Sequence, residues 1–195
     1  MLFIKEITFR SHFFFPVGEN FDYYKNWNVY GNVLVEILKE SMPFFSINMK
    51  IRTAKIRDAE AITAQNISLA KESENILLNP ETVLAGVKAL LSDKKKGFYL
   101  VAEENDTIVG QLMITVEWSD WRNKPIWWVQ SVYVQKEWRK KGVFTQLLDY
   151  IRLKARKQGV AFLRLYAHKN NRSALHVYEK SGWEREPYVF HHLSV

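Results

Sequence analysis

The segment from Val132 to Phe144 constrains the fold of this chain more than any other. An apolar run ends in a short basic turn, the turn reaches Gly142, and an amphipathic helix pattern begins at once. This order brings backbone N–H groups and a helix N-terminus to one point, which is a site for a phosphate or pyrophosphate. Glycine has no Cβ, so a ligand can approach the backbone closely there. Arg139, Lys140 and Lys141 add positive charge. The alternative is a solvated basic loop without a ligand.

The spacing of the other glycines excludes the commoner phosphate loops. No two of the eight glycines are close enough for a dinucleotide G-x-G-x-x-G loop or for a Walker loop. The chain has no cysteine, which excludes disulfides, zinc–thiolate sites and a cysteine nucleophile. His191 and His192 are adjacent on an expected strand and therefore point to opposite faces, so no metal site is expected.

Length and charge allow one domain with a tail. At 195 residues and 47% apolar residues, the chain can bury a core of ordinary size. The net charge is +7, and the first 48 residues hold only four Lys/Arg against five Asp/Glu, so the positive balance lies after them. A basic surface attracts polyanions such as a phosphorylated cofactor or nucleic acid. No apolar run reaches the about 18 residues of a membrane span, and no signal-peptide pattern is present, so we expect a cytoplasmic protein without a membrane partner.

Residues 1–48 differ in pattern from the remainder. They are rich in aromatic residues but sustain neither a period of 2 nor one of 3.6. A clear strand pattern begins at Met49. We therefore interpret 1–48 as an N-terminal extension, either disordered or the product of a misassigned start, with a functional aromatic arm as the alternative. Residues 49–195 are expected to form one folded domain.

The pattern from Met49 onward predicts a mixed α/β (α+β) fold. Strands are expected over residues 49–53, 98–103, 107–117, 126–134, 161–167 and 183–193. Helices are expected over residues 58–72, 80–91, 142–158 and 172–181, with Asp58, Asn79 and Asn171 as N-caps of three of them. Strand 126–134 is almost continuously apolar and is expected at the centre of the sheet, with helices on both faces.

Two motifs carry a family resemblance. The run Arg139-Lys140-Lys141-Gly142-Val143-Phe144 resembles the acetyl-CoA motif [QR]-x-x-G-x-[GA] of the GNAT acetyltransferase superfamily. The segment from Asn171 to Trp183 resembles the second signature of that family, N-x-x-A-x-x-x-Y-x-x-x-G-[FW]. The element order from Met49 to about Leu193 is also similar. Phe144 departs from the small residue that usually ends the first motif.

The resemblance implies a cofactor and a fold in detail. The sheet is expected to be mostly antiparallel, with six to seven strands, and to be splayed between the parallel strands 126–134 and 161–167. Acetyl-CoA would place its pyrophosphate on the turn 139–144, with Val143 and Phe144 at the helix start. Its pantetheine arm would contact the backbone of Val132 and Val134, as an added strand does. Asn171 is a further expected contact with the cofactor.

The resemblance also assigns chemistry, but only in part. Tyr178 would protonate the departing thiolate as a general acid. Where many family members carry a glutamate base, this chain has Trp128, so Glu117 is a tentative base and a water chain, held by Gln130, is the alternative. Trp118, Trp128 and Gln130 are expected to line the acceptor pocket, although core packing explains the tryptophans equally well.

The expected function is transfer of an acetyl group from acetyl-CoA to a primary amine on a small molecule or peptide, by direct attack in a ternary complex. A non-catalytic acyl-CoA sensor is one alternative. A nucleic-acid-directed module is another, but few aromatics interleave with the cations between Lys136 and Lys157, so nucleic acid is not an expected partner. A homodimer is among the expected assemblies.

Overall fold

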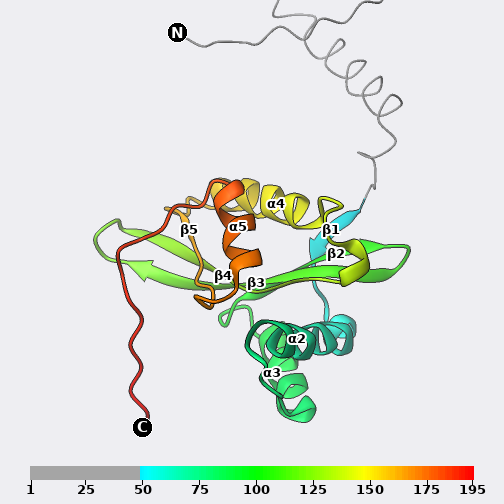
Figure 1. Ribbon diagram of the computed structural model, residues 1–195. Coiled ribbons are helices and arrows are strands. Elements are labelled where there is room, and N and C mark those ends of the chain that lie inside the picture. Colours follow the sequence, from blue (N-terminus) through cyan, green and yellow to red (C-terminus); the bar gives the residue numbers. More distant parts are fainter. Residues whose placement is uncertain (1–48) are drawn as a thin grey trace, which may run out of the picture. The chain divides into compact units, whose positions relative to one another are not determined.

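The computed structural model describes residues 49–195, and all expectations about residues 1–48 lie outside the described residues. One sheet contains β1 (Lys50–Thr53), β2 (Phe98–Glu104), β3 (Thr107–Ser119), β4 (Lys124–Val134) and β5 (Leu163–Arg164), in that spatial order (Figure 1). The first four strands pair antiparallel, and β5 pairs parallel to β4. The predicted mixed, mostly antiparallel sheet with a parallel pair is confirmed.

Helices cover both faces of the sheet, as predicted (Figure 1). On one face lies α4 (Val143–Lys157), with α5 (Arg172–Lys180) beside it; on the other lie α2 (Ala59–Glu74) and α3 (Pro80–Ser92). Apolar residues of α4 recur at helical spacing and enter a core with β2, β3 and β4. A second core lies between the sheet and α2 and α3. None of the helices within 49–195 is long and apolar enough to cross a membrane.

Local sequence signals predicted the starts of the helices correctly, with one exception. The Asn79 side chain accepts a hydrogen bond from the Thr82 N–H (2.8 Å), and Asn171 accepts one from the Ala174 N–H (3.1 Å), so both predicted caps are confirmed. The prediction that the Asp58 side chain caps α2 is wrong. Asp58 lies at the end of a short 3-10 helix, η1 (Ile56–Asp58), and its side chain makes no cap bond to α2.

The Asp58 carboxylate belongs instead to an ion-pair network beneath β1. It accepts two hydrogen bonds from the Arg52 guanidinium, at 2.7 and 2.9 Å, and one from the Lys55 N–H at 2.6 Å. The same guanidinium donates to Glu103 on β2 (Nε to Oε2, 2.8 Å). The side chains of Arg52, Asp58 and Glu103 are all nearly buried. The network therefore joins β1, β2 and the entry to α2.

The sheet changes its register in the middle of β4. Gln111 pairs with Tyr133 and Met113 pairs with Gln130, so one more residue is used on β4 than on β3. Ser131, in the extra position, has a left-handed φ of 49°. On the other side of β4, pairing with β5 ends at Trp128. The two parallel strands therefore separate just before the irregularity, which is the predicted splay.

The number of strands is lower than predicted. Within residues 49–195 the sheet has five strands, not six to seven, because the segment 183–193 does not form a strand. A strand needs a partner for its N–H and C=O groups, and β5 offers only the two-residue edge Leu163–Arg164. The segment is held by side chains instead: Glu186 pairs with Arg164 (2.9 Å), and the Phe190 ring contacts Trp128.

A chain that begins at Met49 is expected to melt cooperatively and to keep its affinity for acetyl-CoA. The Met49 side chain is buried in the core of the domain, so Met49 belongs to the folded unit and we expect a chain that keeps it to fold. The measurement is a thermal melt followed by calorimetric titration with the cofactor. Aggregation or the loss of a transition would show that part of 1–48 belongs to the core.

Candidate functional site

The turn between β4 and α4 has the geometry of an anion site. A short 3-10 helix, η2 (Lys136–Trp138), leads into it, and Lys140 (φ 63°) and Gly142 (φ 78°) both adopt left-handed backbone conformations. Helix α4 then begins at Val143, where the first N–H groups of a helix have no acceptor within it and carry partial positive charge. A Cβ at Gly142 would meet no atom within 4 Å, so this side of the turn is open.

The side chains of this turn divide into exposed cations and one anchor. Lys140 and Lys141 are exposed, and the Lys141 ammonium lies 5.0 Å from the centre of the Trp138 ring. The Val143 side chain is buried against β3, where a Cβ at Gly110 would lie 2.8 Å from it. Val143 can therefore offer a ligand only its backbone N–H.

Arg139 is directed differently from the sequence expectation. Its Nε donates to the Val134 carbonyl (2.9 Å), and its Nη2 donates to the Glu72 carboxylate on α2 (2.7 Å). The guanidinium is thus engaged by protein groups on both sides. Sequence reasoning missed Glu72, although a signal was present: a glutamate in the last turn of a helix opposes the helix dipole, which favours a cationic partner.

Val132 and Val134 lie on the stretch of β4 that no longer pairs with β5. Their side chains pack against the core on the α4 face of the sheet. The Val134 carbonyl is occupied by Arg139, whereas the remaining edge of β4 has the form to which an extended ligand can add as a strand.

Tyr178 stands on α5 beside the start of α4. Its ring contacts Phe144 at a centroid distance of 5.7 Å and Trp183 at 6.2 Å. Burial raises the pKa of Tyr178 to about 12, so the phenol keeps its proton at neutral pH. The large residue at position 144, which departs from the motif, is explained by this contact: Phe144 supports the Tyr178 ring.

The predicted acceptor residues are only partly brought together. The Trp128 indole donates to the Glu117 carboxylate (2.6 Å), and the Gln130 amide donates to the Thr115 hydroxyl (2.8 Å), so these side chains share one face of the sheet. Trp118 follows Glu117 on β3 and therefore projects from the opposite face, where it is 61% exposed. The structure does not place Trp118 with Trp128 and Gln130.

Three residues beside Glu117 were not predicted. Arg164 lies with Nη1 3.9 Å from the Glu117 carboxylate and with its guanidinium 5.2 Å from the centre of the Trp128 ring. The rings of Tyr166 and Phe190 lie 6.1 and 6.0 Å from the Trp128 ring. Phe190 comes from the C-terminal segment, and no local pattern predicts that this segment reaches the site.

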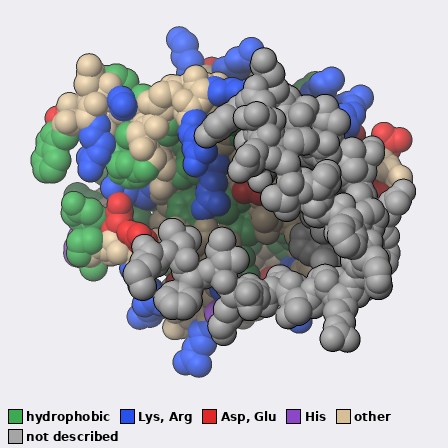
Figure 2. Space-filling model, turned by 90° about the horizontal axis from the view of Figure 1, so that it is seen from above, with side chains coloured by type: hydrophobic (Ala, Val, Ile, Leu, Met, Phe, Trp, Pro, Cys, Tyr) green, Lys and Arg blue, Asp and Glu red, His purple; other side chains and the backbone are tan. Residues whose placement is uncertain are grey.

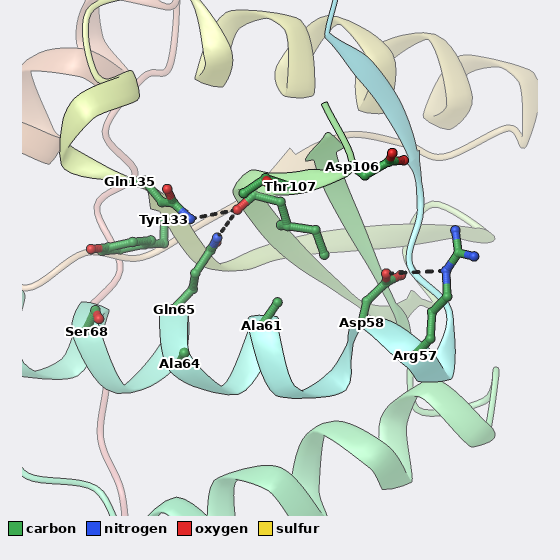
Figure 3. Close-up of a pocket in the computed structure, with 11 residues that line it drawn as sticks. Arg57, Asp58, Ala61, Ala64, Gln65, Ser68, Asp106, Thr107, Tyr133 and Gln135 are labelled. Carbon is green, nitrogen blue, oxygen red and sulfur yellow. Dashed lines mark hydrogen bonds and ion pairs between the residues drawn. The ribbon is translucent and has the colours of Figure 1, made fainter. Parts of the chain in front are cut away.

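A hollow of about 500 Å³ lies elsewhere on the domain, between α2 and the paired ends of β3 and β4 (Figure 3). The small side chains of Ala61 and Ala64 leave room on α2, and the amides of Gln65 and Gln135 both donate to the Ile108 carbonyl at 2.8 Å. No residue of the turn 139–144 lines this hollow, so it is distinct from the predicted cofactor site.

The placement of charged side chains does not identify a class of partner. On the part of the surface that Figure 2 leaves uncovered, Lys and Arg side chains stand at several separate places. Among the residues that the structure describes, no group of three or more His, Asp or Glu side chains could hold a metal ion. The expectations about nucleic acid and oligomeric state stay predictions.

Comparisons with known proteins agree with this geometry. Residues 64–183 match the model of the Acetyltransferase (GNAT) family. The chain is 29% identical over 144 residues to a Bacillus subtilis (strain 168) protein called "Uncharacterized N-acetyltransferase YhfO". The aligned residues cover 74% of this chain and 95% of that protein. The crystal structure of a possible acetyltransferase from Clostridium difficile 630 is 41% identical, with a TM-score of 0.71, over 75% of this chain and 97% of that one.

The crystal structure of a predicted acetyltransferase with acetyl-CoA from Clostridium acetobutylicum is also similar. It is 20% identical to this chain, with a TM-score of 0.62, over 74% of this chain and 96% of that one, and this likeness shows a shared fold. The family match includes the turn after β4, the splayed strands and all of α5 with Tyr178. This chain therefore belongs to the GNAT family of acetyltransferases.

Proposed function

We propose that the protein transfers the acetyl group of acetyl-CoA directly to a primary amine in a ternary complex. The observation that carries this proposal is the left-handed Gly142 turn at the start of α4, which stands beside the open edge of β4 and, through Phe144, beside the Tyr178 phenol. A relative of the same fold, from Clostridium acetobutylicum, is described with acetyl-CoA, which supports this choice of donor.

The proposed roles follow from the chemistry of each group. The N–H groups at the start of α4 bind the pyrophosphate, helped by Lys140 and Lys141, and Asn171 lies at the start of α5 as a further contact. The backbone near Val132 holds the pantetheine arm. Holding donor and amine together lowers the barrier by several kcal/mol, with about 7–11 kcal/mol as the ideal limit.

Each bond change can be assigned. The amine nitrogen attacks the thioester carbonyl carbon, a C–N bond forms, and the C–S bond breaks. The thiolate takes the proton of the Tyr178 phenol. The proton lost by the amine passes to Glu117 or to a water held by Gln130. Glu117 Oε2 is bound by the Trp128 indole, whereas the nearest cation to Oε1, Arg164, is 3.9 Å away, so Oε1 is the oxygen that would accept this proton.

The surroundings of Glu117 favour a cationic acceptor. The Trp128 and Phe190 rings and the carboxylates of Glu117 and Glu186 lie around one region of the sheet, together with the Arg164 guanidinium. Aromatic faces and carboxylates both attract ammonium groups. We therefore include amines with a second positive charge among the candidate acceptors.

The test is a panel of amines, including diamines and peptides with free N-termini, incubated with acetyl-CoA and followed by thiol release. Direct transfer predicts that both substrates must bind before either product leaves, so double-reciprocal plots at several fixed concentrations of the second substrate intersect. Parallel lines would indicate a covalent acyl-enzyme. Tight binding of acetyl-CoA without turnover on any amine would favour the alternative, a non-catalytic acyl-CoA sensor.

Replacing Gly142 by Asp is expected to weaken acetyl-CoA binding at least about tenfold, which corresponds to about 1.4 kcal/mol. The Cβ itself enters open space, but the carboxylate brings negative charge to the point where the phosphates would bind. Calorimetric titration with acetyl-CoA measures the change.

Gly159→Asp is the matched control for this variant. Gly159 follows the other end of α4, has a similar φ of 67°, and also leaves its Cβ in open space, so it reproduces the backbone strain without approaching the turn. Equal losses of affinity in both variants would attribute the effect to strain and would remove the turn from the binding site.

A further inference from the structure

We propose that Glu72 of α2 is a positioning residue for the cofactor turn, and that Arg139 acts by fixing this turn to α2 and not by contacting the phosphates. The inference rests on the proposed binding of acetyl-CoA at residues 139–144. Glu72, Tyr133, Lys136 and Arg139 are called the Glu72 cluster below.

Both oxygens of the Glu72 carboxylate are used within the cluster. Oε2 accepts the Arg139 Nη2–H at 2.7 Å, and Oε1 accepts the Tyr133 hydroxyl at 2.9 Å, with the Lys136 ammonium at 3.8 Å. Figure 3 shows Tyr133 reaching over the turn of α2 that carries Ser68, so strand and helix are in direct contact here. Burial alone would raise the pKa of Glu72, but the hydrogen bonds from Arg139 and Tyr133 lower it.

The planar guanidinium of Arg139 links its own turn to β4 and to α2. Its Nε donates to the carbonyl of Val134, the last residue of β4, while its Nη2 reaches Glu72 on α2. The guanidinium also lies over the Tyr133 ring, 5.4 Å from its centre. A guanidinium held by a carbonyl, a carboxylate and a ring has a fixed direction, and this direction is toward α2.

These contacts fix the position of the turn. Between Val134 and Arg139 the chain forms η2, and the two ends of this loop are closed by the Arg139–Val134 hydrogen bond. Glu72 fixes the guanidinium that makes this closure. Lys140 and Lys141, which follow at once and are exposed, are then the cations that the turn presents to a phosphate.

Two hypotheses for Arg139 predict opposite signs for one substitution. If Arg139 binds the pyrophosphate directly, Glu72 competes for its guanidinium, and Glu72→Gln should tighten the binding of CoA. If Glu72 positions the turn, Glu72→Gln should weaken it. The glutamine keeps the size of the side chain and can still accept from Tyr133, so the charge-assisted bond to Arg139 is the principal loss.

The experiment is calorimetric titration of the full chain with CoA, for the wild type, Glu72→Gln, Arg139→Gln and the double variant. We expect each single variant to bind about fivefold more weakly, the upper range for one partly exposed pair. The double variant should bind no more weakly than either single one, because both remove the same link. In steady-state assays, KM for acetyl-CoA should rise with little change in kcat.

Glu74→Gln is the matched control, since Glu74 lies on the same turn of α2 and is exposed. It should bind CoA as the wild type does, and thermal melts of all variants should verify that they are folded. Affinity in Glu72→Gln equal to or above that of the wild type, or fully additive losses in the double variant, would overturn the inference alone. Absence of CoA binding by the wild type would overturn the proposed function, and the role of Glu72 with it.

Discussion

Replacing Tyr178 by Phe is expected to lower kcat by about 100-fold, the usual scale for a positioned acid, while acetyl-CoA affinity stays within about twofold. The substitution keeps the ring between Phe144 and Trp183 and removes only the hydroxyl proton donor. Steady-state kinetics and calorimetry with acetyl-CoA measure the two quantities separately. Wild-type turnover in Tyr178→Phe would show that water or the ammonium intermediate protonates the thiolate.

The raised pKa of Tyr178 adds a prediction on pH. Because burial holds the pKa of the folded state at about 12, against about 10 in the unfolded chain, the phenol is protonated in both states at neutral pH. The contribution of this raised pKa to the free energy of unfolding is complete below about pH 10 and is lost between about pH 10 and pH 12, since the unfolded state then loses the proton more readily. The free energy of unfolding of Tyr178→Phe should therefore fall less as the pH rises than that of Tyr150→Phe. Tyr150 is the control position, because it lies on α4 and is 37% exposed.

The parts of the fold that the sequence predicted are those with local causes. Helix α4 was predicted from the spacing of its apolar residues, and β2 and β3 from two strand patterns that only residues 104–106 separate. Asn105 and Asp106 between them both adopt left-handed conformations, which suits a tight hairpin turn. The turn before α4 was predicted for the same reason, because glycine at residue 142 and the surrounding cations are neighbours in the chain; its role in binding a cofactor stays a prediction.

What the sequence could not predict depends on residues far apart in the chain. The segment 183–193 has the composition of a strand, but a strand also needs an edge to pair with, and β5 is too short to provide one. The direction of Arg139 depends on Glu72, which lies 67 positions earlier. The surroundings of Glu117 likewise depend on where the C-terminal segment carries Phe190.

Replacing Arg52 by Ala is expected to lower the free energy of unfolding by about 3 kcal/mol, at the lower end of the range for breaking a buried ion pair. The guanidinium is 13% exposed and makes hydrogen bonds of 2.7 to 2.9 Å to Asp58 and Glu103, so its removal takes the nearly buried cation from two nearly buried carboxylates. Only the exposed cations of Lys50, 3.2 Å from Glu103, and Arg57, 3.9 Å from Asp58, then remain beside them. Urea unfolding at neutral pH measures the loss. Arg57→Ala is the control, because Arg57 is 67% exposed and lies 3.9 Å from Asp58, so a change within about 0.5 kcal/mol is expected.

The pH dependence of this difference identifies its cause. Burial alone would raise the pKa of Asp58, but the hydrogen bonds from Arg52 and from the Lys55 N–H together outweigh it and lower the pKa; hydrogen bonds from Arg52 and Lys50 lower that of Glu103 as well. A depressed pKa gives stability that is present above the unfolded pKa, about 4, and is lost as the pH falls through the folded value. In Arg52→Ala the hydrogen bonds from Arg52 are gone while burial and the Lys55 N–H bond remain, so protonation of these carboxylates costs the variant less stability than it costs the wild type. The two unfolding free energies should therefore converge as the pH falls below about 4. A difference that stays constant over this range would show that Arg52 stabilises the domain by packing and not by its charge.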